Sequence, residues 1–287
     1  MQQGPSESGF HFVQDYRNCK RYFYHKYVDD IESKDKPTAI LFGIAAHRGL
    51  EEYYKLEKAG SLGLPQRIAK AVEAFKDEMQ VLKQYYEYND MFEADFARGQ
   101  DLLREYGLTY SSDKWRIHSV ESTLQHTFES GDIFTGRIDL VIVNEQGYLY
   151  VVDHKFTGWS IALFKKTQLT SDQATGYKLL WDSNNEQKVR GTIFNIIRSY
   201  KGQTDYDRVV VTKTPADVEE FEQDMQADLI EMRQRLMDPN GRWPKNTDQC
   251  FKFNRLCPYA DICQGMKNWQ SLIGLRLKYR DHQLGDE

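Results

Sequence analysis

The sequence predicts an α/β protein with a mixed central β-sheet flanked by helices. Apolar residues recur at helical intervals until about Tyr110, and β-rich runs bounded by turn residues begin at Trp115. After the third of these runs, helical and strand-like segments alternate, an order typical of α/β and α+β folds. A chain of 287 residues with 40% apolar residues can bury one large core, so residues 1–287 are expected to form a single elaborated domain.

Helices are expected over most of the N-terminal third of the chain. The first runs from about Val13 to Tyr27, and the second, "TAILFGIAAHRGLEEYYKLEKAG", ends at Gly60. From Pro65 to about Tyr110 the apolar spacing remains helical. Residues 60–115 are therefore predicted to form a helical segment within the domain.

Three β-rich runs follow, which are "WRIHSVESTLQHTFE", "DIFTGRIDLVIVN" and "GYLYVVDHKF". The turn signals between them predict an antiparallel meander of three strands. A helix over "SDQATGYKLLWDS" is expected next, capped by Ser171 or Asp172. Two more strands, "GTIFNIIRS" and "DRVVVTKT", precede a long amphipathic helix from about Pro215 to Met237.

Charge and hydropathy exclude several classes of protein. The net charge of -5 gives no overall basic field, so nucleic-acid binding would have to come from local basic patches. No apolar run is long enough to cross a membrane, and the first thirty residues lack the features of a signal peptide. We therefore expect a soluble, cytoplasmic protein that does not associate with membranes.

The four cysteines are too few to suggest a disulfide scaffold in a chain of this size. Cys19 stands alone near the start, whereas Cys250, Cys257 and Cys263 lie close together near the end. Four thiolates can bind zinc or a [4Fe-4S] cluster, and their spacing does not decide between the two. The alternative is one buried helical cysteine and three unrelated loop cysteines. Three thiols between residues 250 and 263 favour a ligand cluster that joins the first helix to the C-terminal region.

Two acidic residues lie in neighbouring predicted strands. Asp139 interrupts the apolar run "GRIDLVIV", and Asp153 and Lys155 end the next run. A hairpin turn near Gly147 would bring the two strands side by side, so Asp139 and Asp153 could converge at one edge of the sheet. Two such carboxylates suit a hard divalent cation such as Mg2+ or Mn2+.

The alternation of side chains along a strand puts Asp153 and Lys155 on one face and the His154 side chain on the other. A lysine beside a metal-bound water can position that water and stabilise the charge that develops when a phosphodiester is attacked. The alternative for this pair taken alone is the solvated, charged edge of a strand.

Two helical pairs lie at a spacing of four residues. His47 and Glu51 share a helix face, and His47 could supply a nitrogen ligand to the same cation, or else be a structural or surface histidine. Gln173 and Tyr177 share another face and could contact a DNA backbone or hold Lys155. Their alternative is half-exposed packing.

Taken in order, these residues resemble the RecB-like branch of the PD-(D/E)XK nuclease superfamily. More narrowly, the chain resembles the CRISPR-associated and AddB-type nucleases that carry an iron-sulfur cluster. The resemblance runs from about Ser6 to Cys263, and "GRIDLVIV" followed by "VVDHKFTG" is its most specific part. The helical segment 60–115 contributes no motif to it.

The resemblance implies a restriction-endonuclease-like core with a helical segment and a C-terminal cluster-binding region. It implies a catalytic set and a set of ligands for Mg2+ or Mn2+ and for a [4Fe-4S] cluster. The catalytic residues would be Lys155, Asp153, Asp139, Gln173 and Tyr177. The divalent metal would be bound by His47, Asp139, Asp153 and the backbone carbonyl of His154. The cluster would be bound by Cys19, Cys250, Cys257 and Cys263. The family commonly places two residues between its first two C-terminal cysteines, and this sequence places six.

The resemblance implies a metal-dependent DNA nuclease. The expected substrate is single-stranded DNA or DNA with free ends, cut by an exonuclease in recombination, repair or CRISPR adaptation. A helicase or an integrase is the kind of protein partner that this role implies. The alternative is a non-catalytic DNA-binding or adaptor protein with a vestigial nuclease site.

Two further stretches bear on the substrate and the site. The aromatic and basic residues of "CKRYFYHKY" could stack on bases and neutralise phosphates, or could pack inside the protein. Trp159, after Lys155, could stack on a base. Glu121 could be an accessory acid or a surface residue, and it is left outside the predicted site.

Overall fold

The computed structural model describes residues 9–34, 36–200, 202–238, 240–252, 255–265, 269–274 and 276–279. The chain divides into two compact units. Lys36–Leu124 and Arg137–Glu219 form what we call the sheet unit, and the described residues of the remaining ranges form the cysteine unit. The prediction of a single nuclease domain over residues 1–287 extends beyond the described residues and stays a prediction.

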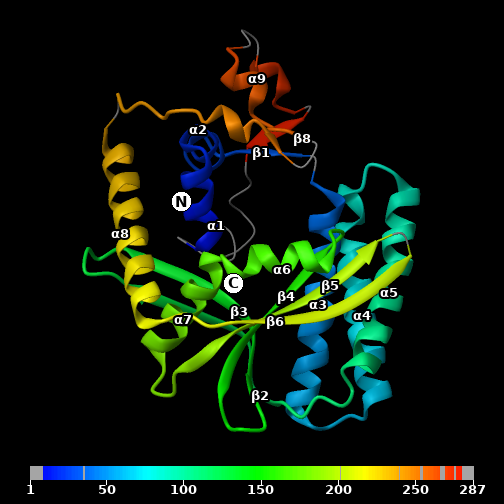
Figure 1. Ribbon diagram of the computed structural model, residues 1–287. Helices are drawn as coiled ribbons and strands as arrows, with labels where there is room; N and C mark the ends of the chain where they lie inside the picture. The colour runs from blue at the N-terminus through cyan, green and yellow to red at the C-terminus, as the bar shows by residue number, and fades with distance from the viewer. Residues whose placement is uncertain are drawn as a thin grey trace. The chain divides into compact units, whose positions relative to one another are not determined.

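A five-stranded mixed sheet is the centre of the sheet unit (Figure 1). Its strands lie in the order β2, β3, β4, β5, β6. Their bounds are Arg116–Thr127, Ile133–Val143, Leu149–Thr157, Val189–Tyr200 and Gln203–Val211. β3 and β4 are antiparallel, β4 and β5 parallel, and β5 and β6 antiparallel. The predicted mixed central sheet is therefore confirmed.

The helices of the sheet unit agree with the expected pattern apart from one addition. Their bounds are α3 Thr38–Ala59, α4 Leu64–Leu82, α5 Asn89–Thr109, α6 Ile161–Leu169 and α7 Asp172–Asn184, with a 3-10 turn at Lys83–Tyr85. α3 ends at Gly60, whose φ of 65° suits a residue without a side chain. The predicted helical segment 60–115 is confirmed as α4 and α5. The sequence pattern does not predict α6.

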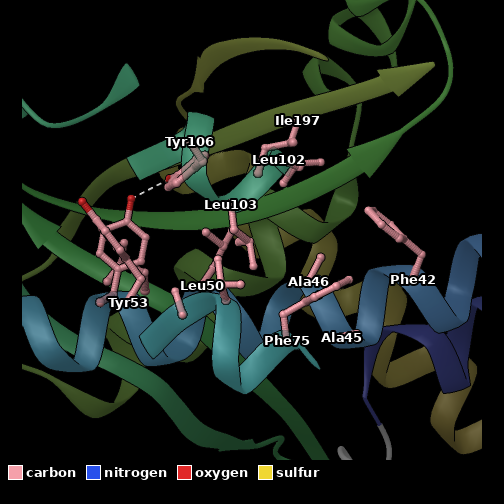
Figure 2. Close-up of a cluster of buried hydrophobic side chains, with 14 of the residues drawn as sticks. Phe42, Ala45, Ala46, Leu50, Tyr53, Phe75, Leu102, Leu103, Tyr106 and Ile197 are labelled. Atoms are coloured by element: carbon pink, nitrogen blue, oxygen red, sulfur yellow. Dashed lines mark hydrogen bonds between the residues drawn. The ribbon is translucent and has the colours of Figure 1, made fainter. Parts of the chain in front are cut away.

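The three helices α3, α4 and α5 cover one face of the sheet and enclose its largest apolar cluster (Figure 2). Leu140, Val152 and Ile193 contribute to it from three neighbouring strands. On α5, Gly99 lies so close to α4 that an added Cβ would be 2.0 Å from the Phe75 ring. The helices can approach this closely only because the position carries no side chain.

The opposite face of the sheet packs against α6 and α7. Val141 and Val151 meet Tyr177 and Trp181 of α7 in one apolar cluster. A second cluster joins strand residues to Ala174 of α7, with side chains of α6 packed against it. The sheet is thus covered by helices on both faces, which is the arrangement that the sequence predicts and that a restriction-endonuclease-like core has.

The cysteine unit contains short elements from both ends of the chain and one long helix. The elements are α1 Phe10–Asn18, α2 Lys20–Phe23, a π-helical turn at Tyr24–Val28, β1 Ile31–Ser33, α8 Pro215–Met237, a 3-10 turn at Thr247–Gln249, β7 Phe251–Lys252, β8 Arg255–Leu256, α9 Ala260–Cys263, a 3-10 turn at Trp269–Leu272 and β9 Leu277–Tyr279. The helix predicted from Pro215 to Met237 is α8, which is Pro215–Met237 in the structure. β1 and β9 pair antiparallel.

The prediction of one continuous helix from Val13 to Tyr27 is wrong. Cys19 has extended backbone angles, with φ at -160° and ψ at 108°, and separates α1 from α2. Its Sγ accepts a hydrogen bond from the Tyr22 amide, as an N-cap side chain does. Local capping by the thiol therefore ends one helix and starts the next.

The aromatic side chains of "CKRYFYHKY" pack within the cysteine unit. Phe23 is fully buried and stacks on Trp243, with ring centroids 5.9 Å apart. Tyr22 meets Tyr259 edge to face. The structure therefore favours internal packing over base stacking for these side chains. Among the described helices of the whole chain, none is long and apolar enough to cross a membrane.

Candidate active site

The end of β4 carries Asp153 and Lys155 toward α7. The Lys155 ammonium lies 2.7 Å from Asp153 Oδ2 and donates a hydrogen bond of 2.8 Å to Gln173 Oε1. The Asp153 side chain is 4% exposed, whereas that of Lys155 is 24% exposed. A buried carboxylate needs a charged or hydrogen-bonded partner, and Lys155 supplies one while keeping access to solvent.

Helix α7 contributes the two side chains that complete this arrangement. Ser171 caps the helix by accepting from the Gln173 amide, and Gln173 and Tyr177 lie one turn apart on the same face. Gln173 Nε2 donates to the Tyr177 hydroxyl at 2.7 Å and to Asp153 Oδ1 at 3.3 Å. The Tyr177 hydroxyl in turn donates to Asp153 Oδ1 at 2.5 Å. Both the nitrogen and the oxygen of the Gln173 side-chain amide therefore have hydrogen-bond partners, and the oxygen accepts from Lys155.

Asp139 is held beside β4 from the neighbouring strand. The backbone pairing of β3 with β4 extends to Leu140 and Val152. After this last pair, the backbone amide of His154 donates to Asp139 Oδ2 at 3.0 Å. A side-chain oxygen thus takes the place of the β3 carbonyl that would accept this hydrogen bond in a regular sheet. In an extended strand the N–H and C=O of one residue point the same way. The His154 carbonyl accordingly faces the same side as Asp139.

His47 of α3 approaches Asp139 from the face of the sheet that α3, α4 and α5 cover. Its Nδ1 lies 3.4 Å from Asp139 Oδ2. Ile138 packs in the cluster with Tyr177, whereas Leu140 packs in the cluster with α3. Regular alternation along a strand would put the side chains of residues 138 and 140 on the same face of the sheet, so the alternation of β3 is interrupted at Asp139. This change lets Asp139 meet His47 although Asp153 meets α7.

Burial controls the electrostatics of this group. Burial raises the pKa of Asp139, the His47 charge opposes that rise, and the Asp153 carboxylate adds to it. Burial also raises the pKa of Tyr177 well above its usual value, and Asp153 raises it further. Tyr177 therefore stays a neutral hydrogen-bond donor to Asp153 at physiological pH.

The His154 side chain lies on the other face of β4, as the sequence predicts. Its ring stacks on Tyr54, and Asn195 Nδ2 donates to its Nδ1 at 2.9 Å. Burial lowers the pKa of His154 well below its usual value, so the ring is neutral. Only the backbone of His154 is therefore directed toward the site.

Glu121 is a residue of this neighbourhood that the sequence analysis left out. Its side chain is 14% exposed, and Oε2 lies 2.9 Å from Nε of Arg137. Burial, and then the Asp139 carboxylate, raises the pKa of Glu121 to about 7. Its position on β2, the strand next to β3 that carries Asp139, was the signal available in the sequence.

The predicted metal ligands are brought near one another without closing around a common point. In the parts of the chain that the structure describes, no three His, Cys, Asp or Glu side chains are grouped closely enough to hold a metal ion. The donors are nonetheless of the right chemistry for a hard cation, with two carboxylates, an imidazole and a carbonyl. Asp153 Oδ2 is buried and accepts no hydrogen bond of good geometry from any described residue, although the Lys155 ammonium is within ion-pair distance.

All four cysteines lie in the cysteine unit as free thiols. Burial, and to a smaller extent the charges of the other three cysteines, raises the pKa of Cys257 to about 11, so the four sulfurs are within electrostatic range. Cys19 Sγ accepts hydrogen bonds from the amides of Tyr22 and Asn246 at 3.4 and 3.3 Å.

The long spacing between Cys250 and Cys257 has a structural explanation. β7 and β8 pair as a small hairpin, with Phe251 opposite Leu256, and the Cys257 amide donates to the Cys250 carbonyl at 2.7 Å. The two cysteines therefore face each other across the base of the hairpin. The two cysteines are therefore close to one another although six residues separate them in the sequence. Residues 253 and 254 lie outside the described part.

Comparisons with known proteins agree with this geometry at the level of the family. A family model described as the PD-(D/E)XK nuclease superfamily matches residues 12–264 of the chain. No curated protein matches the chain closely enough to be counted as a relative. Among solved structures, one titled "Crystal structure of SSO0001" is similar over 77% of this chain and 83% of its own, with 14% sequence identity and a TM-score of 0.32.

Proposed function

The chain belongs to the PD-(D/E)XK nuclease superfamily, and on that premise we propose that it is a metal-dependent DNA nuclease whose site is built on Asp139, Asp153 and Lys155. Nuclease members of this superfamily typically use divalent metals such as Mg2+. The observation that carries the proposal is the position of Lys155, held between Asp153 and Gln173 at a partly exposed strand end. A solvated strand edge would not need this buried support.

His47, Asp139, Asp153 and the His154 carbonyl would hold the divalent cation. When bound, such a cation lowers the pKa of a coordinated water and neutralises charge on the phosphate that is attacked. The roles of the protein groups follow from their contacts. Asp153 is kept in place by Tyr177 and Gln173, which donate to its Oδ1.

Lys155 is placed to act on the attacking water or the phosphate. An ammonium group has three N–H donors, of which one donates to Gln173, while Asp153 Oδ2 lies within ion-pair distance of the ammonium. An N–H that these two partners do not engage can donate to a water or to a phosphate oxygen. Because its two partners fix the ammonium in advance, the group needs little reorganisation during the reaction.

The finer parts of the proposal rest on the resemblance of the ordered motifs. We propose an exonuclease that acts on single-stranded DNA or free ends in recombination, repair or CRISPR adaptation, in the cytoplasm and with a helicase or an integrase as partner. The RecB-like order of His47, Asp139, Asp153, Lys155 and the Gln173 pair supports this choice. The local distances are equally compatible with an endonuclease.

The proposal is tested with end-labelled single- and double-stranded DNA, incubated with Mg2+, with Mn2+ and with EDTA. We expect cleavage in the presence of either metal and none with EDTA, and the sizes of the labelled products give the polarity. Binding of DNA without any metal-dependent cleavage would contradict the nuclease assignment. The non-catalytic adaptor with a vestigial site would then replace it.

We also propose that Cys19, Cys250, Cys257 and Cys263 bind a [4Fe-4S] cluster. Four thiols within electrostatic range, two of them facing each other across a hairpin, support a shared ligand set. Amide donors to Cys19 Sγ are the kind of contact that tunes iron-sulfur clusters. The preference for iron over zinc rests on the resemblance.

Protein prepared without oxygen should be brown, with about four iron and four acid-labile sulfide per chain. A Cys257→Ser variant should lose the colour because burial already disfavours a charged ligand at this position and serine binds iron poorly. A stoichiometric zinc content with no iron would contradict the cluster while leaving the four-cysteine site in place.

A further inference from the structure

Glu121 has an unusual backbone conformation in the middle of β2. Its φ is 50°, and among the described residues other than glycine only Asp30 also has a positive φ. A left-handed residue inside a strand is strained, and it turns its side chain out of the regular alternation. The chain thus directs the Glu121 carboxylate to a position that a regular strand would not give.

The Glu121 carboxylate is directed at Arg137 of the neighbouring strand β3. Their ion pair joins Oε2 to Nε at 2.9 Å, and within the described residues Glu121 is the one acid paired with Arg137. The Arg137 side chain is 53% exposed, although its partner is 14% exposed. The pair is an ion pair without a hydrogen bond of good geometry to Oε2, and it is made through Nε, so Glu121 does not engage the two terminal nitrogens of the guanidinium.

This ion pair lies beside the candidate active site. Arg137 precedes Asp139 by only two residues on β3, so the two residues are near one another on the same strand. The Asp139 charge contributes to the raised pKa of Glu121, which shows that the two carboxylates are within electrostatic range. Arg137 is therefore anchored next to the predicted metal ligands.

A cationic side chain at this place would favour DNA binding in addition to the proposed divalent cation. Asp139, Asp153 and Glu121 present three carboxylates, which repel the phosphates of a nucleic acid. Lys155 is already engaged by Asp153 and Gln173. An arginine with exposed terminal nitrogens can bind a phosphate with two parallel hydrogen bonds.

We propose that Arg137 binds a phosphate of the DNA strand next to the bond that is cut, and that Glu121 is the positioning residue that orients its guanidinium. This inference rests on the proposed nuclease function and extends it to the substrate backbone. An ion pair with one exposed partner contributes little to stability, whereas a left-handed glutamate destabilises the strand. The strain at Glu121 is explained if the orientation of Arg137 serves the substrate.

The substrate contact is tested by DNA binding in EDTA, so that cleavage cannot interfere. The affinity for a labelled single strand is measured at several salt concentrations for wild type, Arg137→Ala and the control Arg104→Ala. Arg104 is 50% exposed and pairs with Asp101 on α5, away from the site. Loss of one phosphate contact should reduce the slope of log affinity against log salt by about 0.7 for Arg137→Ala alone. An unchanged slope in Arg137→Ala would overturn the inference.

The role of Glu121 is tested by a double-mutant cycle on cleavage. Glu121→Gln should lower kcat by about tenfold in the wild-type background, a loss that corresponds to one misplaced hydrogen-bonding group. In the Arg137→Ala background the same change should have little effect, because there is no guanidinium left to orient. An equal loss in both backgrounds would assign Glu121 a structural role and overturn its role as a positioning residue.

Failure of the inference is distinguishable from failure of the proposed function. If wild type cuts DNA and Arg137→Ala binds and cuts as well as Arg104→Ala, the inference alone is wrong. If wild type binds DNA but never cuts it, the nuclease assignment fails and the salt slope still decides whether Arg137 contacts a phosphate. If wild type neither binds nor cuts DNA, both are overturned.

Discussion

Asp153 receives more support than any other acidic side chain of the candidate site. Tyr177 and Gln173 donate to one of its oxygens, and the Lys155 ammonium lies beside the other. Such a buried carboxylate is expensive to desolvate and is stable only while these donors are in place. The unfavourable desolvation of Asp153 is explained if its carboxylate must be held in one position to bind a cation next to a phosphate.

Tyr177→Phe tests this preorganisation. The change removes the hydroxyl that donates to Asp153 at 2.5 Å and keeps the ring. We expect a loss of about 1 to 3 kcal/mol in unfolding free energy, because a buried acceptor loses a donor. Cleavage should fall by about tenfold or more, because Asp153 is no longer held in one position.

The matched control is Tyr206→Phe, which removes a tyrosine hydroxyl that donates to the Leu102 carbonyl outside the site. It should lower stability to a similar degree and leave cleavage unchanged. If both variants lost cleavage equally, the effect of Tyr177 would be one of general stability.

At the residue scale, the proposed catalytic and metal-binding residues were easier to predict from the sequence than the residues that surround them. Asp139, Asp153 and Lys155 could be predicted because an acid or a lysine in an apolar strand is conspicuous. Glu121 could be noted only as an accessory acid or a surface residue, and its pairing with Arg137 could not be predicted, because it depends on burial, on a positive φ and on a contact between strands. None of these is visible in a linear pattern.

A polar network connects the elements behind the active-site face. Tyr54 of α3 and Tyr106 of α5 share a hydrogen bond of 2.6 Å between their hydroxyls. Asn195 of β5 donates to Tyr106 and to His154, and Arg208 of β6 donates to Asn195. These hydrogen bonds thus connect residues of α3, α5, β4, β5 and β6, where β4 is the strand that carries Asp153.

This network makes stability depend on pH through His154. Burial lowers the pKa of His154, so the folded protein keeps the ring neutral while the unfolded chain takes up a proton below about pH 6.5. The contribution of neutral His154 is therefore present above that pH and is lost as the pH falls toward the folded-state pKa.

The pH effect is isolated by comparing wild type with His154→Gln in urea unfolding. The difference in unfolding free energy between the two should shrink by about 1 kcal/mol from pH 7 to pH 5.5. Two stability curves that run parallel over this range would show that His154 does not titrate differently in the folded and unfolded states.

At the element scale, periodicity predicted α3, α4, α5, α7, α8 and the five strands of the sheet. It did not predict α6, whose nine residues begin at Ile161 shortly after β4, because so short a stretch gives little periodic signal. It also missed the break at Cys19, because a cap made by a thiol is not a usual helix-stop signal.

At the scale of the whole molecule, the two proposed cofactor sites belong to different compact units. The predicted catalytic residues lie in the sheet unit, and all four cysteines lie in the cysteine unit. The cysteine unit is assembled from segments that are distant in sequence, with Cys19 near one end and Cys250 to Cys263 near the other. Its predicted cluster would connect these segments as a structural cross-link.

The order of the motifs predicted a RecB-like member of the PD-(D/E)XK nuclease superfamily, and the family-model match confirms the superfamily. The division into two compact units was not predicted, because no linker or change in composition marks it. The β7 and β8 hairpin explains the departure from the cysteine spacing that the resemblance to iron-sulfur nucleases implies, which the sequence shows only as a longer gap.

The measurement that tests the central claim most directly is the single-turnover cleavage of labelled DNA by Lys155→Ala in Mn2+. Its control is Lys178→Ala, which removes another largely buried lysine, paired with Asp182 on α7. If the lysine stabilises charge in the transition state as proposed, Lys155→Ala should cleave about 100-fold or more slowly than wild type, and Lys178→Ala should cleave at close to the wild-type rate. Undiminished cleavage by folded Lys155→Ala would contradict the account.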